Sequence, residues 1–108
     1  MNEVELVNLA RSHYSEEQVA LLEKAIHYAT DKHDGQLRKR GEPYITHPLQ
    51  VAAMLIDWGM DIDSVIAGVL HDTVEDTDAT LEEITELFGR DIAFLVDGVT
   101  KFSQARAG

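Results

Sequence analysis

The stretch DIDSVIAGVLHDTVED, residues 61–76, decides the fold. Residues that suit a protein core recur in it at the three- and four-residue spacing of one helix face. They are Ile62, Val65, Ile66, Val69, Leu70 and Thr73. Asp61 stands just before them and has the side chain of a helix N-cap, which accepts a hydrogen bond from a free backbone N–H group of the first turn. We therefore predict a helix that begins behind Asp61 and lies at the centre of the fold.

The rest of the chain is helical in pattern as well, and no segment alternates with the period of two that a half-buried strand requires. Capping boxes mark two helix starts, because Ser15 and Thr80 are each followed three positions later by Gln or Glu. Further helices are predicted at residues 4–10, 15–34, 48–59 and 80–89 and at about 91–98. A length of 108 residues suits one folding unit. The prediction is a single all-α domain of about five to six helices.

Acidic residues are concentrated in the middle of the chain, whose formal net charge is −11. Residues 41–89 contain eleven Asp or Glu and no Lys or Arg. A field of this sign repels DNA and an anionic membrane surface, whereas it attracts metal cations. The chain has no cysteine, which excludes a thiol nucleophile and agrees with a cytoplasmic location. No signal peptide and no apolar run of about 20 residues is recognisable, so no membrane partner is expected.

The pair His71-Asp72 closes the central helix and is followed at once by Glu75 and Asp76. If the helix continues for one turn, each acid lies four residues above one member of the pair, so four metal-binding or proton-transferring groups share one face. Burying such groups is costly unless a cation compensates them. His47, at the start of the preceding helix, could supply a further imidazole. Taken alone, the pair also fits a surface hydrogen bond, and the acidic run also fits a solvated helix face.

A basic triplet, Arg38-Lys39-Arg40, lies in the predicted loop of residues 35–46 that runs into His47. Arginine offers a planar face for stacking and a fork for phosphate, while lysine offers a point charge. The position of the triplet therefore favours binding of an anion or an aromatic base near the candidate metal ligands. A surface cluster without function is the alternative.

Three segments together resemble a known family: GQLRKRGEPYITHP (35–48), VAAMLIDWGMDIDSVIAGVLHDTVEDT (51–77) and FGRDIAFLVDGVTK (88–101). They are similar to the N-terminal hydrolase domain of the RelA/SpoT alarmone synthetase/hydrolases, a branch of the HD metal-dependent phosphohydrolases. The resemblance implies an all-helical HD-domain bundle. It also implies hydrolysis of the 3′-pyrophosphate of the guanine nucleotide (p)ppGpp to GDP or GTP and pyrophosphate, usually with Mn²⁺.

By the same resemblance, the metal ligands are His47, His71 and Asp72. Glu75 and Asp76 match the acidic pair that positions and activates the attacking water.

The resemblance also implies substrate-binding roles for two residues of the basic triplet. Arg38 matches the arginine that stacks on the guanine, and Lys39 matches the neighbouring lysine on the base and phosphate side. Arg40 stands where the family commonly has a serine, and no role is assigned to it.

One family element is missing from this sequence, namely a later aspartate ligand in a motif that resembles KLADRLHNMRT. We therefore expect residues 1–108 to be the N-terminal part of a single hydrolase domain, truncated on its C-terminal side, impaired in activity and weak in its binding of the one Mn²⁺ ion. A homo-oligomer could form through the surface that truncation exposes. Two other functions stay open at this point: an HD phosphohydrolase that acts on another nucleotide, and a non-catalytic module that binds a nucleotide or a partner.

Overall fold

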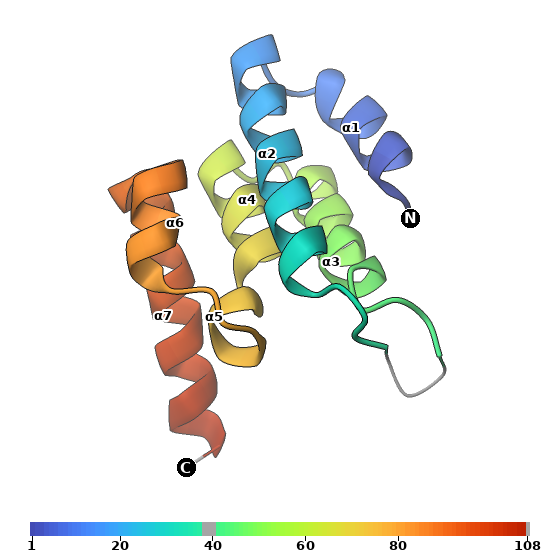
Figure 1. Cartoon of the computed structure of the whole chain (residues 1–108). Helices are drawn as coiled ribbons and strands as arrows, with labels where there is room; N and C mark the ends of the chain where they lie inside the picture. Colours follow the sequence, from blue (N-terminus) through green and yellow to red (C-terminus); the bar gives the residue numbers. More distant parts are fainter. Residues whose placement is uncertain (38–40, 108) are drawn as a thin grey trace.

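The computed structural model describes residues 1–37 and 41–107, with the side chains of residues 102–107 excepted. Within these residues the regular structure is helical, apart from one isolated bridge between Leu37 and Pro43 (Figure 1). The helices are α1 (Glu3–Arg11), α2 (Glu16–Lys32), α3 (Thr46–Asp57), α4 (Ile62–Leu70), α5 (Thr73–Asp76), α6 (Leu81–Phe88) and α7 (Arg90–Ala107). Of the helices in this described part, six have eight or more residues and α5 is a single turn. The predicted all-α bundle is confirmed.

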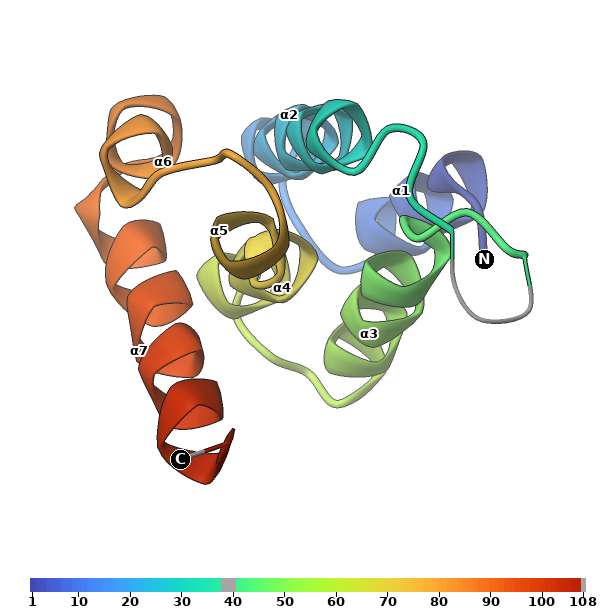
Figure 2. The same cartoon turned by 60° about the horizontal axis from the view of Figure 1, so that its bottom comes forward.

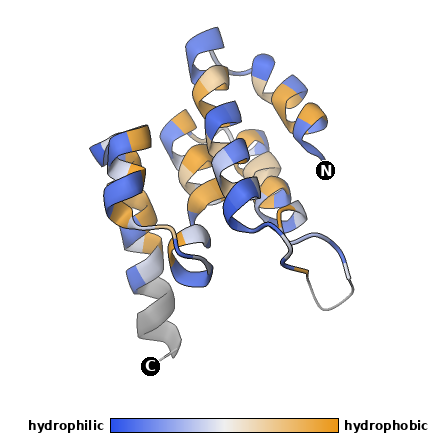
Figure 3. Cartoon of the chain, in the orientation of Figure 1, coloured by the Kyte–Doolittle hydropathy of each residue, from blue (hydrophilic) through white to orange (hydrophobic). Residues whose placement is uncertain are grey.

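Helix α4 lies at the centre of the bundle, as predicted. Helices α2, α3 and α7 pack around it, and α5 follows at its end (Figure 2). All six residues of its predicted core face are buried, and most of α4 has hydrophobic colours in Figure 3. Gly68 lets α3 approach closely, because a Cβ atom there would lie 2.8 Å from Leu55 Cδ1. Burial of these side chains stabilises the bundle by about 1.5–3 kcal/mol for each large aliphatic group.

The predicted N-terminal caps agree with the structure, with one difference. Ser15 forms a complete capping box, and Asp61 caps α4. Thr80 Oγ1 accepts a hydrogen bond from the backbone N–H of Glu83 at 3.2 Å, but the other half of the box is not formed. Instead, the Glu83 carboxylate accepts a hydrogen bond from the Tyr28 hydroxyl of α2 at 2.7 Å. A tertiary contact therefore replaces half of the second capping box.

The central helix ends earlier than its pattern suggests. Helix α4 stops at Leu70, and His71 and Asp72 form a turn before α5. The chain then makes one more helical turn, because the backbone N–H of Asp76 donates to the carbonyl oxygen of Asp72 at 2.9 Å. The helical turn that was predicted to follow the HD pair is therefore present, but as the separate helix α5.

The last helix is longer than predicted. Helix α7 runs to Ala107 rather than ending near residue 98. An ion pair between Lys101 and Asp97, with 3.0 Å between Nζ and Oδ2, supports the part beyond residue 98.

Some large apolar side chains stay exposed. Phe94 on α7 is 76% exposed, and Trp58, which ends α3, is 68% exposed. Self-association through such a surface remains a prediction. No helix in the described part of the chain has the length and apolar character needed to cross a bilayer.

Candidate metal centre

Three side chains converge where α3 begins and α4 ends. His47 lies in the first turn of α3, and His71 and Asp72 form the turn behind α4. Each offers one ligand atom, and these atoms all lie within 4.8 Å of one another. The side chains of His71 and Asp72 are 19% and 13% exposed, so a bound ion would be only partly open to solvent. The structure therefore brings together the three metal ligands predicted from the sequence.

The connection between α3 and α4 explains this convergence. The two helices pack against each other and run in opposite directions (Figure 1). Gly59, with a φ of +77°, makes the tight turn between them. A short connection of this kind returns the chain along its neighbour. The start of α3 and the end of α4 therefore lie at the same end of the bundle.

His71 is oriented by the backbone of its own helix. Its Nδ1 atom lies 2.6 Å from the carbonyl oxygen of Gly68. A carbonyl can only accept, which assigns the proton to Nδ1 in the neutral ring. Nε2 is then the free ligand atom, and it lies 3.0 Å from Asp72 Oδ1. Metal-binding histidines commonly have this support, with the second ring nitrogen donating to a carbonyl or carboxylate.

Without a cation the site favours a charged pair, in which His71 Nε2 carries a proton toward Asp72 Oδ1, and a bound metal would replace that proton. Burial opposes ionisation of Asp72, but hydrogen bonds from His71 and Tyr44 and the charges of the two histidines outweigh it, so the pKa of Asp72 lies below its usual value. Burial likewise opposes protonation of His71, but its hydrogen bonds to Asp72 and Gly68 and nearby negative charge raise its pKa. Two imidazoles and a carboxylate are a suitable donor set for a divalent transition metal.

Glu75 and Asp76 lie at the edge of this centre on α5, and both are exposed. They are not members of the group whose ligand atoms lie within 4.8 Å. Asp76 Oδ2 lies 3.4 Å from the hydroxyl of Tyr44, and the charge of Glu75 contributes to the raised pKa of His71. The acids therefore adjoin the candidate metal ligands and face solvent, where a water molecule and a substrate have access.

Comparison with known proteins identifies the fold. A family model described as HD domain matches residues 25–108, which include His47, His71 and Asp72. The chain belongs to the HD-domain family.

Relatives of this HD domain include RelA/SpoT-type enzymes. A Myxococcus xanthus protein named GTP pyrophosphokinase is 55% identical over 87 residues, 81% of this chain and 12% of that protein. An Aquifex aeolicus protein named guanosine-3′,5′-bis(diphosphate) 3′-pyrophosphohydrolase is 50% identical over 95 residues, 88% of this chain and 14% of that protein. A solved structure of a metazoan SpoT orthologue, described as hydrolysing ppGpp, matches with a TM-score of 0.72 and 36% identity. That match covers 81% of this chain and 49% of the other.

In the loop before α3, residues on either side of the basic triplet bond to the segment of residues 72–76. The predicted substrate residues Arg38 and Lys39, like Arg40, lie outside the described residues. At the start of the loop, the Gln36 side-chain amide donates to the carbonyl oxygen of Asp76 at 3.0 Å. At its end, the Tyr44 hydroxyl donates to Asp72 Oδ2 at 2.6 Å.

Sequence reasoning assigned no role to Tyr44 or to Gly68, although both contact the HD pair. The Tyr44 carbonyl oxygen accepts from the backbone N–H of His47 at 3.1 Å, so the two residues share a turn. The spacing of three between Tyr44 and His47 is the sequence signal that could have identified the tyrosine.

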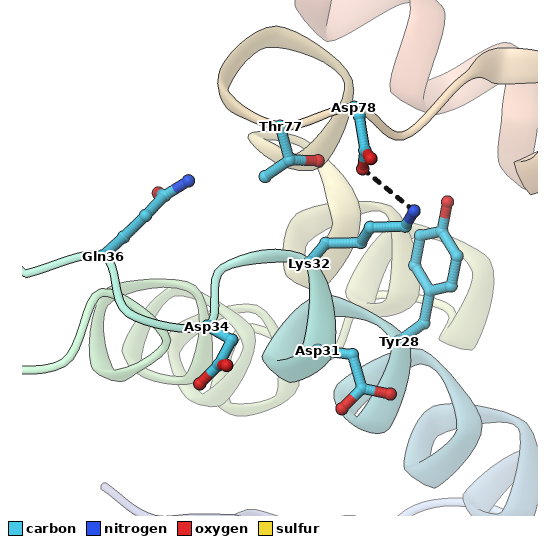
Figure 4. A pocket seen from close by; sticks show the side chains of 7 residues that line it. All are labelled: Tyr28, Asp31, Lys32, Asp34, Gln36, Thr77 and Asp78. Atoms are coloured by element: carbon cyan, nitrogen blue, oxygen red, sulfur yellow. Dashed lines mark hydrogen bonds and ion pairs between the residues drawn. The ribbon is translucent and has the colours of Figure 1, made fainter.

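A polar hollow on the α2 side of this HD domain does not include the three candidate ligands (Figure 4). It is lined by Tyr28, Asp31, Lys32, Asp34, Gln36, Thr77 and Asp78. Lys32 spans it, with its Nζ atom 3.0 Å from Asp78 Oδ1 and 3.7 Å from Glu83 Oε1. These ion pairs join α2 to the segment around α6. The role of Lys32 is therefore structural.

Proposed function

We propose that this protein hydrolyses the 3′-pyrophosphate of (p)ppGpp with Mn²⁺, giving GDP or GTP and pyrophosphate. The observation that carries this proposal is the convergence of His47, His71 and Asp72 within 4.8 Å in a chain of the HD-domain family. The name of the Aquifex aeolicus relative supplies the substrate class.

The metal would be held by these three residues. The donor set fits it, because His71 Nε2 is left free by the bond from Nδ1 to Gly68 and Asp72 is held in its ionised form. When bound, the ion supplies positive charge that polarises a phosphate and lowers the pKa of a water molecule.

Glu75 and Asp76 orient the attacking water and accept its proton. The water oxygen forms a bond to phosphorus, the bond between that phosphorus and the 3′ oxygen breaks, and the 3′ oxygen leaves as a hydroxyl after it gains a proton. Support comes from the exposed position of both acids beside the cluster. General base assistance of this kind is worth about 10²- to 10⁴-fold in rate.

Arg38 and Lys39 bind the nucleotide in this proposal, with the arginine on the guanine and the lysine on the base and phosphate side. The motif resemblance supports these roles. The described ends of their loop add to that support, because Gln36 and Tyr44 both bond to the segment that carries the HD pair.

Residues 1–108 form the N-terminal part of one hydrolase domain in this proposal. The chain spans 12% and 14% of its two bacterial relatives and 49% of the solved SpoT orthologue, so it corresponds to a part of each.

The test is release of pyrophosphate from ppGpp by the purified chain with Mn²⁺, compared with release of phosphate from ordinary nucleotides. We expect pyrophosphate release that requires Mn²⁺ and disappears in His71→Ala. The same assay is made on the Aquifex aeolicus enzyme after its 95 aligned residues are exchanged for those of this chain. Turnover of ordinary nucleotides alone would favour another HD phosphohydrolase, and nucleotide binding without turnover in both proteins would favour a binding module.

A further inference from the structure

Tyr44 joins the candidate metal site to the loop that precedes it. Its hydroxyl donates to Asp72 Oδ2 at 2.6 Å and lies 3.4 Å from Asp76 Oδ2. The first contact has the length of a strong hydrogen bond to a carboxylate, while the second is long and weak. One side chain therefore contacts both a candidate metal ligand and a candidate general base.

The two carboxylate oxygens of Asp72 have different partners. Oδ1 lies 3.0 Å from Nε2 of His71, and Oδ2 receives the tyrosine hydroxyl. Because Tyr44 engages Oδ2, the oxygen that faces the candidate ligand His71 is Oδ1. A carboxylate held at both oxygens cannot rotate freely about its Cβ–Cγ bond, so its ligand atom is oriented before any ion binds.

The ring of Tyr44 is itself held in place. It packs against the ring of His33 with 4.6 Å between centroids and 32° between planes. His33 is only 3% exposed, and its Nδ1 atom lies 3.1 Å from Gln36 Oε1. Gln36 donates through Nε2 to the Asp76 carbonyl oxygen, so its Oε1 accepts and His33 Nδ1 carries the proton. Among the described residues, His33 Nε2 has no hydrogen-bond partner, so the contribution of this nitrogen-bearing ring edge is its packing beside Tyr44.

We infer that Tyr44 is a positioning residue, which orients Asp72 for metal binding and fastens the chain just before α3 to the metal site. This inference rests on the metal site of the proposed function. Groups that hydrogen-bond to metal ligands typically contribute about 10- to 100-fold to metal affinity. Tyr44 therefore raises the affinity for the ion without touching it.

The test is the dissociation constant of Mn²⁺ in the Tyr44→Phe variant of the whole chain, measured by titration followed by electron paramagnetic resonance. The phenylalanine keeps the ring against His33 and removes only the hydroxyl. We expect the dissociation constant to rise about 10- to 100-fold. Co²⁺ gives a second readout, because a reoriented Asp72 changes the visible absorption of the bound ion.

Tyr28→Phe is the matched control. Tyr28 also donates to a carboxylate, that of Glu83, at 2.7 Å, and its bond joins α2 to α6. This variant should bind Mn²⁺ as the wild type does and leave the Co²⁺ spectrum unchanged.

The outcomes separate the two proposals. Suppose that the wild-type protein binds Mn²⁺ and that the dissociation constant of Tyr44→Phe lies within twofold of the wild-type value, with the same Co²⁺ spectrum. The proposed role of Tyr44 is then wrong, while the proposed metal site is supported. If the wild type binds no Mn²⁺, the metal site is wrong and the role of Tyr44 falls with it. Equal loss of affinity in Tyr28→Phe would also overturn the inference, because the effect would then be a general one on stability.

Discussion

The Nδ1 atom of His71 lies 2.6 Å from the carbonyl oxygen of Gly68, one turn earlier in the same stretch of chain. Gly68 also lies where α4 meets α3, since a Cβ atom there would come within 2.8 Å of Leu55 Cδ1. The same glycine therefore orients one candidate ligand and sets the distance to the helix that carries another, His47. Gly68 therefore links helix packing to the geometry of the candidate metal site.

Gly68→Val should destabilise the protein by about 1–3 kcal/mol, because the added side chain must displace Leu55 or separate the two helices. Unfolding by urea, followed by circular dichroism, measures this loss. Gly98→Val on α7 is the control, since a Cβ atom there meets nothing within 4 Å. Valine forms helix at least as well as glycine, so propensity predicts no loss at Gly98, and a loss there as large as that at Gly68 would show that the contact with α3 is not the cause.

Removal of a candidate ligand should abolish most of the metal affinity. His47→Ala and His71→Ala each remove one of three converging donors, and we expect affinity for Mn²⁺ to fall by about 100-fold or more, since loss of a group that only hydrogen-bonds to a ligand already costs about 10- to 100-fold. Isothermal titration calorimetry measures the change. His27→Ala is the control, because His27 lies exposed on α2 and pairs with Glu3 at 3.0 Å, and its removal should leave metal affinity unchanged.

Mn²⁺ should stabilise the folded chain, and a chelator should remove that gain. An ion that binds only the folded state adds about 2.7 kcal/mol at a concentration 100 times its dissociation constant. For a domain of this size the melting temperature should rise by about 10 °C or more. Differential scanning calorimetry with and without EDTA tests this, and a rise of the same size in His71→Ala would contradict the assigned site.

The double variant Glu75→Gln/Asp76→Asn should keep the metal and lose turnover. Neither acid belongs to the group of converging ligand atoms, so affinity for Mn²⁺ should change little. Loss of the general base should slow release of pyrophosphate from ppGpp by about 10²- to 10⁴-fold. An unchanged rate would remove both residues from the mechanism.

The Asp61 cap at the start of α4 should make a small, pH-dependent contribution to the free energy of unfolding. Hydrogen bonds from the hydroxyl and backbone N–H of Ser64 hold the pKa of Asp61 below its usual value. This stabilisation is present above the pKa of the unfolded chain and is lost as the pH falls through the lower folded pKa. Asp61→Asn keeps a capping side chain without the charge, so its free energy of unfolding at pH 7 should be lower than that of wild type by about a few tenths of a kcal/mol, and this deficit should shrink as the pH falls. Urea unfolding at pH 7 and at pH 3 measures it, and a deficit that stays constant would exclude the charge as its cause.

The sequence by itself determined the features that depend on neighbouring residues. Ser15 and Asp61 cap helices as expected, because a cap and its N–H partner lie within one turn. The buried face of α4 followed from spacing, because a regular helix brings residues three and four positions apart to one side. His47, His71 and Asp72 were identified through a motif, and two of them are adjacent in the chain.

Only the tertiary structure decided which distant groups meet. The Glu83 side chain does not complete the predicted capping box, because its carboxylate accepts a hydrogen bond from Tyr28, which lies 55 residues earlier. Tyr44 reaches Asp72 across 28 residues because α3 and α4 return the chain to one end of the bundle. Such contacts depend on how whole helices pack, and local pattern does not encode the distance between two side chains on different helices. The orientation of the candidate metal ligands therefore came from packing, while the sequence pointed out which residues they are.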